Sequence, residues 1–247
     1  MTTPSTPLRA DGRTANELRE VRITTGCNPY AEGSCLIQFG RTEVICTASV
    51  QTKVPQWLKG KGQGWLTAEY GMLPRATGER KDREATRGKQ DGRTVEIQRL
   101  IGRSLRSICT LSDMDGLTLW LDCDVLVADG GTRTAAITGS YIAAALALRE
   151  CASKKLLRGP VLREPVAAIS CGLTDTGVIL DMDYAEDSQT HADANFVMSA
   201  SGDWIEVQVS AEQRPVKDAE IALMKDYAAQ GIRQLIDLQQ QALAMSA

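Results

Sequence analysis

The sequence predicts a mixed α/β (α+β) protein built from two similar halves. Runs of β-type residues precede a helical pattern in the first part of the chain and again in the last, an order typical of strands and helices that share one core. At 247 residues, the chain is long enough to bury such a core. No inter-domain linker is visible, and the halves are not related by a clear sequence repeat.

The first half opens with two short β runs, at 34–39 and 43–49. Gly40, Arg41 and Thr42 between them predict a hairpin. The stretch 54–93 that follows is basic, glycine-rich and weakly periodic. A connection of that length is seldom passive, so we expect it to be functional or part of an interface.

Helical patterns follow that stretch. From Thr94, apolar residues recur at helical spacing, namely Ile97, Leu100, Ile101, Leu105 and Ile108. A buried strand is predicted at 117–127 and an alanine-rich helix at 134–150. In the second half we expect β runs at 166–171, 178–183, 195–199 and 204–210, and then a final helix at about 216–244.

The composition is that of an ordinary globular chain. Hydrophobic residues make up 43% of it, yet no apolar run approaches the roughly 18 residues that a membrane helix needs, so we expect no membrane partner. Residues 1–8 contain Pro4 and Pro7 and resemble neither a secretory signal nor a transit peptide. They predict a flexible tail and a cytoplasmic protein.

Seven cysteines are scattered along the chain without any Cys-x-x-Cys pair. An odd, dispersed set argues against a disulfide framework and against structural zinc. Most lie within apolar runs, so we expect buried, reduced thiols.

Charge is distributed unevenly. The net charge is only −3, but residues 52–106 hold 13 Lys and Arg against 6 Asp and Glu. Such a block can bind a polyanion, or it can be one solvated positive face, and charge alone leaves both readings open. Its arginines Arg75, Arg80, Arg83 and Arg87 could follow a phosphate backbone or pair with the acidic residues Glu79, Asp82 and Glu84 between them.

Two short segments, Gly92-Arg93-Thr94 and Gly131-Thr132-Arg133, lie at the start of predicted helices. At Gly130–Thr134 the glycines let backbone amides approach a ligand, Thr132 adds a hydroxyl, and Arg133 adds a guanidinium suited to phosphate. A capped turn is the alternative, although an arginine in the first turn opposes the helix dipole unless an anion is bound. Arg93 could act in the same way, or Thr94 could simply cap its helix.

The segment 181–193 is strongly acidic, with five carboxylates and no Lys or Arg. Clustered carboxylates raise one another's pKa unless a cation binds, and oxygen ligands suit Mg²⁺ or Mn²⁺. Asp187 and Asp193 could share one ion if the chain turns back between them; a solvated acidic loop is the alternative. His191, the only histidine, excludes sites that need two, and we expect it to be peripheral.

Taken together, these stretches resemble the ribonuclease PH family, which is related to polynucleotide phosphorylase and to exosome ring subunits. The resemblance runs through DGRTANELR, GQGWLTAEYGMLPR, GKQDGRTVEIQRLIGRSLR, LDCDVLVADGGTRTAAITG and AEDSQTHADANFVM. It implies a single domain over 1–247 of two βαβα-like halves, the ribosomal protein S5 domain 2-like arrangement. It further implies a homo-hexameric ring, a trimer of dimers, that removes nucleotides from RNA 3′ ends with inorganic phosphate and releases nucleoside diphosphates, acting on tRNA precursors and rRNA.

The resemblance also implies roles for particular residues. Phosphate binding falls to Arg93, Gly131, Thr132 and Arg133, and RNA binding to Arg75, Arg80 and Arg83. Catalysis falls to Arg93, Arg133, Asp187 and Asp193, of which the two aspartates would hold Mg²⁺ or Mn²⁺. His191 stands where family members often carry an acidic residue, which could alter metal affinity. A catalytically silent RNA-binding ring subunit is the alternative function.

Overall fold

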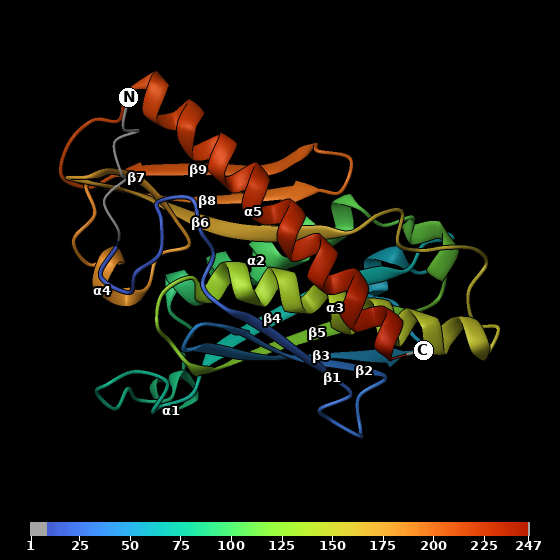
Figure 1. The fold of residues 1–247 in the computed structure, drawn as a ribbon. Helices are drawn as coiled ribbons and strands as arrows, with labels where there is room; N and C mark the ends of the chain where they lie inside the picture. The colour runs from blue at the N-terminus through green and yellow to red at the C-terminus, as the bar shows by residue number, and fades with distance from the viewer. Residues whose placement is uncertain (1–8, 247) are drawn as a thin grey trace.

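The computed structural model describes residues 9–246 and forms two β-sheets with helices between and beside them (Figure 1). The tail predicted at 1–8 lies outside the described residues. The first sheet and its helices comprise β1 (Val21–Thr25), β2 (Gly33–Phe39), β3 (Thr42–Gln51), β4 (Trp65–Met72), α1 (Glu84–Arg87), α2 (Gly92–Ser107), β5 (Thr118–Val127) and α3 (Thr132–Ser153), with 3₁₀ turns at Gln56–Leu58 and Leu111–Met114. The strand order is β1-β2-β3-β5-β4, antiparallel except for the parallel β4–β5 pair.

The second sheet comprises β6 (Val166–Thr174), β7 (Gly177–Leu180), β8 (Ala192–Ser199) and β9 (Trp204–Ala211), in the antiparallel order β7-β6-β8-β9. The four-residue helix α4 (Tyr184–Asp187) lies between β7 and β8, and α5 (Asp218–Met245) ends the chain. Figure 1 shows α2 and α3 between the two sheets, with α5 running across β6 and β7. The mixed α/β architecture predicted from the sequence is confirmed.

Helix α3 is the central element because it packs on β2 and β3 on one side and on β6 on the other. Its alanine-rich sequence suits this place, since small side chains let two sheets approach one helix, and 16 of its 22 residues are buried. One hydrophobic cluster accordingly joins both sheets. The N-terminal end of α3 is thereby fixed between the sheets.

Strands β1 and β4 are not among the strands that the sequence predicts. The weakly periodic stretch 54–93 contains β4, whose Leu66, Ala68 and Tyr70 alternate inward beside β5. The two helices expected to begin at Thr94 and Thr134 each begin two residues earlier. These starts place both Arg93 and Arg133 inside the first helical turn.

The thiols behave as expected. All seven cysteines are free, and all but the half-buried Cys27 are buried. Burial raises the pKa of Cys109 to about 12, so that this thiol stays protonated at neutral pH. None of the helices in the described part of the chain combines the length and apolar character needed to cross a bilayer.

Candidate phosphate and cation site

A small cavity of about 60 Å³ opens where the N-terminal end of α3 meets the second sheet. It is lined by all six residues proposed above for phosphate or metal, namely Arg93, Gly131, Thr132, Arg133, Asp187 and Asp193. These residues come from α2, the N-cap and first turn of α3, α4 and β8. Segments up to 100 positions apart in sequence thus converge on one point, while the chemical role of each stays a proposal.

The N-terminal end of α3 has no side-chain cap. Gly131 is the N-cap residue, in the left-handed region at φ 67°, and no side chain of residues 9–246 accepts a hydrogen bond from the first-turn amides. The Thr132 hydroxyl is held in place by Tyr70, whose hydroxyl donates to it at 2.8 Å. Unpaired amides and the positive end of the helix dipole therefore face the cavity, an arrangement that favours an anion.

Two guanidinium groups border these amides. Arg133 is buried, and its Nη1 donates to Gln208 Oε1 at 2.9 Å and to Glu96 Oε1 at 3.2 Å. The Nε and Nη2 atoms of Arg133 have no partner within residues 9–246, so they remain available to a ligand. Arg93 is exposed and makes no ion pair with any described side chain.

The turn before α3 is held rigidly by side chains remote in sequence. Arg19 Nη1 donates to the Asp129 carbonyl at 2.6 Å, and Arg19 Nη2 pairs with the buried Asp181 carboxylate at 2.7 Å. The Thr42 hydroxyl donates to the Gly130 carbonyl at 2.7 Å and accepts from the Asp129 amide at 3.0 Å. These contacts fix the direction of the first-turn amides before any ligand arrives.

Gly130 packs directly against the segment that leads to α4. Its φ is 79°, and a Cβ placed there would lie 2.5 Å from the Met182 carbonyl oxygen and 2.7 Å from the Asp183 carbonyl carbon. Only glycine satisfies both the conformation and the spacing. This contact sets the separation between the amides of α3 and the aspartates beyond Asp183.

Three of the five clustered carboxylates are already neutralised or hydrogen-bonded. Asp181 pairs with Arg19, and Glu186 accepts from Arg9 Nε at 2.6 Å. Asp183 caps α4 by accepting from the Glu186 amide at 2.9 Å. Figure 1 shows the N-terminal segment, which supplies both arginines, running beside α4.

Asp187 and Asp193 are the two carboxylates left without such a partner within residues 9–246. Although much of Asp187 is exposed, partial desolvation raises the pKa of its carboxyl group, and the nearby charge of Asp193 raises it further, against smaller opposing effects of Arg93 and Arg133. Two adjacent carboxylates that lack a cation are the ligands that Mg²⁺ or Mn²⁺ prefers. Residues 9–246 hold no cluster of three or more metal-binding side chains.

His191 lies apart from this cavity. Its ring nitrogens hydrogen-bond to Asp175 at 2.7 Å and to Gln213 at 3.0 Å, and His191 is not among the residues that line the small cavity, although Asp193 is only two positions away. This position agrees with the peripheral place expected for it. The side chain thus tethers two loops and does not line the candidate site.

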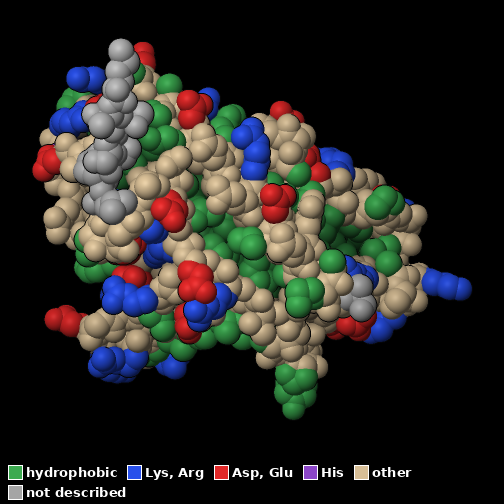
Figure 2. All heavy atoms as spheres, viewed as in Figure 1, with side chains coloured by type: hydrophobic (Ala, Val, Ile, Leu, Met, Phe, Trp, Pro, Cys, Tyr) green, Lys and Arg blue, Asp and Glu red, His purple; other side chains and the backbone are tan. Residues whose placement is uncertain are grey.

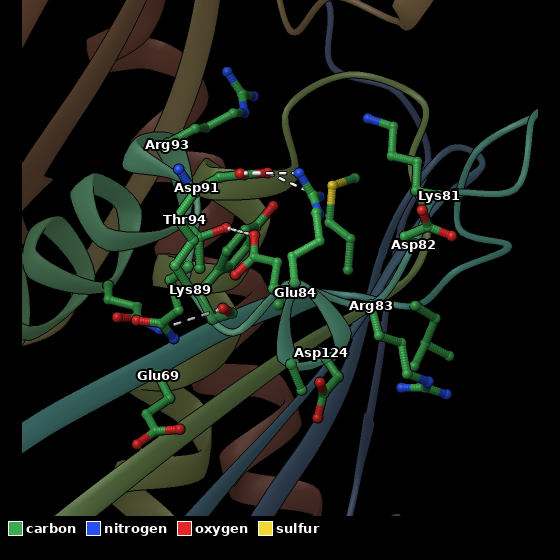
Figure 3. Close-up of a pocket in the computed structure, with 18 of the residues that line it drawn as sticks. Glu69, Lys81, Asp82, Arg83, Glu84, Lys89, Asp91, Arg93, Thr94 and Asp124 are labelled. Atoms are coloured by element: carbon green, nitrogen blue, oxygen red, sulfur yellow. Dashed lines mark hydrogen bonds and ion pairs between the residues drawn. The ribbon is translucent and has the colours of Figure 1, made fainter.

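A second cavity, of about 830 Å³, lies over β4 and β5 and meets the small one at Arg93, which lines both. Figure 3 shows Glu69 and Asp124 on its floor, Arg83 at one side and Arg93 reaching away from the first turn of α2. Figure 2 shows basic and acidic side chains mixed over this α1 region. The basic block of the sequence is therefore not a uniform positive surface.

Of the three arginines proposed for RNA binding, only Arg83 lines that second cavity. Arg80 pairs with Asp82 at 2.8 Å, and Arg75 donates to the Gly78 carbonyl at 3.2 Å. All three are exposed. None is brought into the small cavity.

Sequence comparison identifies the family. Residues 17–150 match the model of the 3′ exoribonuclease family, domain 1, and residues 164–231 match that of domain 2. The chain belongs to the 3′ exoribonuclease family. The matched segments contain every residue that lines the small cavity.

Solved structures with the same fold include members of exosomes. Rrp46 from rice (Oryza sativa) is 21% identical, with a TM-score of 0.77 over 95% of this chain and 100% of that one. The Archaeoglobus fulgidus exosome with RNA bound to the active site is 20% identical, with a TM-score of 0.77 over 93% and 92%. A chain of an archaeal exosome core is 17% identical, with a TM-score of 0.73 over 94% and 91%. These likenesses show that the chain shares the fold of these proteins.

Proposed function

We propose that this chain is a phosphorolytic 3′-to-5′ exoribonuclease, a tRNA nucleotidyltransferase that trims 3′ extensions of tRNA precursors and of rRNA. One observation carries the proposal: a single cavity joins an uncapped helix N-terminus and two guanidiniums to two carboxylates that have no hydrogen-bond or ion-pair partner within residues 9–246. The helix N-terminus and the guanidiniums suit a free phosphate ion, and the two carboxylates suit a divalent ion beside a phosphodiester. Membership of the 3′ exoribonuclease family supports the RNA substrate.

In the proposed mechanism, inorganic phosphate binds to the first-turn amides of α3, the Thr132 hydroxyl, and the free donors of Arg133 and Arg93. The guanidiniums offset the repulsion between this anion and the terminal phosphodiester of the RNA. An oxygen of the bound phosphate then attacks the phosphorus in line, and the bond to the 3′-oxygen of the preceding nucleotide breaks. The products are a nucleoside diphosphate and an RNA shorter by one nucleotide.

Asp187 and Asp193 would hold Mg²⁺ or Mn²⁺, which supplies positive charge to the reacting phosphoryl group and to the leaving oxygen. Phosphate is already a nucleophile, so the chain needs no histidine base. Because one phosphoryl linkage replaces another, the reaction is expected to run in both directions.

Arg75, Arg80 and Arg83 are proposed to contact the RNA backbone, since all three are exposed and Arg83 lines the cavity that adjoins the site. We propose a homo-hexamer, a trimer of dimers, in the cytoplasm. Similarity to chains of archaeal exosomes, one of them solved with RNA bound to its active site, supports a ring and an RNA ligand.

The rival proposal is a catalytically silent ring subunit that binds RNA, which the likeness to exosome chains also permits. One assay separates the two. RNA with a 3′ extension is incubated with and without phosphate, and the nucleotides released are identified. Nucleoside diphosphates formed only with phosphate support phosphorolysis, RNA binding without release supports the silent subunit, and monophosphates formed without phosphate contradict both.

Replacement of Arg133 by alanine provides the matched test of the site. We expect Arg133→Ala to raise the phosphate concentration needed for half-maximal rate by at least about tenfold, because a charged hydrogen-bond donor is lost from the anion site. Arg103→Ala, which breaks an exposed ion pair with Glu206 away from the cavity, is the control. Equal phosphate dependence in the two variants would remove Arg133 from the phosphate site.

A further inference from the structure

Ser170 carries the most informative unassigned group in the molecule. Its residue is 5% exposed, and its Oγ is fully buried without a hydrogen-bond partner in the described chain. The residue nevertheless lines the small cavity together with Arg93, Gly131 and Arg133. A buried hydroxyl without a partner is uncommon, and it calls for a ligand or a bound water.

The hydroxyl lies directly beside the N-terminal end of α3. A Cβ built on Gly131 would lie 3.8 Å from Ser170 Oγ and 3.3 Å from Thr134 Oγ1. Thr134 is already satisfied, since its hydroxyl donates to the Gly131 carbonyl at 2.9 Å. Ser170 is therefore a further free side-chain donor next to the uncapped amides, in addition to Thr132 and the two guanidiniums.

The sheet places this hydroxyl in a row of polar residues that faces the helix end. Ser170 on β6 pairs with Asn195 on β8, and Asn195 pairs with Gln208 on β9. Directly opposed residues point to the same face of a sheet. Gln208 holds Arg133 and Asn195 lines the cavity, so the row forms the floor beneath the helix N-terminus.

Ser170 is also fixed by the contacts that fix the turn. Its carbonyl accepts from the Asp181 amide at 2.8 Å, and the Asp181 side chain pairs with Arg19. Arg19 in turn donates to the Asp129 carbonyl at 2.6 Å. The hydroxyl and the amides of α3 thus belong to one rigid unit, as preorganised anion binding requires.

We infer that Ser170 is a further ligand of the phosphate site, whose hydroxyl donates a hydrogen bond to the inorganic phosphate held at the N-terminal end of α3. The inference rests on the proposed function, which supplies the identity of the anion. It assigns Ser170 to the attacking phosphate and not to the RNA, because the hydroxyl lies beside Gly131.

The test compares Ser170→Ala with Ser104→Ala. Ser104 is a second buried serine whose Oγ has no partner, and it lies on α2 eleven positions beyond Arg93, about 16 Å along the helix. Without phosphate, both variants should be at least as stable as the wild type, because each removes an unsatisfied buried hydroxyl. A structural role for Ser170 would instead lower the melting temperature of Ser170→Ala in phosphate-free buffer.

With phosphate, the two variants should diverge. We expect Ser170→Ala to raise the KM for phosphate about tenfold, which corresponds to about 1.4 kcal/mol, while the KM for RNA stays unchanged. Calorimetric titration with inorganic phosphate should show the same loss of affinity, and the rise in melting temperature on adding phosphate should shrink. Ser104→Ala should match the wild type in all three measurements.

Each outcome decides something. A wild-type enzyme that needs phosphate, with Ser170→Ala equal to it in phosphate KM and affinity, overturns the inference and leaves the proposed function intact. A wild type that neither binds phosphate nor releases diphosphates overturns the proposed function itself. Should Ser170→Ala not fold, Ser170→Cys keeps the shape and offers only a weak donor, and an unchanged phosphate KM in that variant would equally overturn the inference.

Discussion

Gly130→Ala tests how the fold sets the spacing between the first-turn amides of α3 and the carboxylates of Asp187 and Asp193. The added methyl group would lie 2.5 Å from the Met182 carbonyl oxygen, well inside contact distance. The backbone at Met182 and Asp183 must therefore move away from the N-terminal end of α3. Asp183 caps α4, which carries Asp187, so the displacement reaches the candidate metal ligand.

Two effects contribute to the loss of unfolding free energy expected in Gly130→Ala. A non-glycine residue at φ 79° costs roughly 1–2 kcal/mol, and crowding of a packed backbone costs about 1–3 kcal/mol. Gly116→Ala is the matched control, because Gly116 has a φ of 80° and nothing within 4 Å of an added Cβ. The control should therefore show only the backbone cost at positive φ, and the difference between the two variants isolates the contact with Met182.

The assay measures both unfolding and turnover. Gly130→Ala should lower the free energy of unfolding by about 1–3 kcal/mol more than Gly116→Ala. It should also reduce kcat/KM about a hundredfold, because a displacement of about 1 Å in a catalytic site costs that much. Equal stability loss in the two variants, with normal turnover in both, would refute the argument that Gly130 sets the spacing of the site.

Three further predictions concern charge. Arg19→Met should lower the free energy of unfolding by about 3–5 kcal/mol in denaturant titration, because it leaves Asp181 buried and unpaired; a loss no larger than that of Arg22→Met at an exposed pair would contradict this. Asp187→Asn should abolish turnover and the stabilisation of the protein by Mg²⁺. The pKa of Asp187 is raised in the folded state, so the folded protein loses free energy of unfolding as the pH rises through that pKa. In metal-free buffer, the free energy of unfolding of Asp187→Asn should therefore exceed that of the wild type by an amount that grows with pH. A pH-independent difference would count against the raised pKa. Arg83→Ala should weaken RNA binding and reduce the salt slope by about one without altering the phosphate KM, and an unchanged slope would remove Arg83 from the RNA contact.

Local sequence was enough to predict the parts of the site that act through their own helix. The glycines and arginines at 130–133 and at 92–93 indicate a helix N-terminus that favours an anion, and both segments do begin helices. The acidic segment also indicated a cation site. Which of its carboxylates stay unpaired was beyond sequence reasoning, because the arginines that neutralise Asp181 and Glu186 lie more than 160 positions away.

Other features left weaker signals. The inward alternation of Leu66, Ala68 and Tyr70 in β4 was present in the sequence, but the glycines and charges around it concealed the strand. Ser170 stands inside the apolar run of β6 and has no local mark of function. Its importance arises only from the packing of β6 against the N-terminal end of α3, which no local pattern encodes.

The central claim is that inorganic phosphate is the attacking reagent. The most direct measurement supplies radiolabelled inorganic phosphate with unlabelled RNA and locates the label in the nucleotides released. We expect label at the terminal phosphate of the nucleoside diphosphates, in amounts equal to the nucleotides removed, and none with Arg133→Ala at low phosphate. Shortened RNA with no label in the released nucleotides would contradict it.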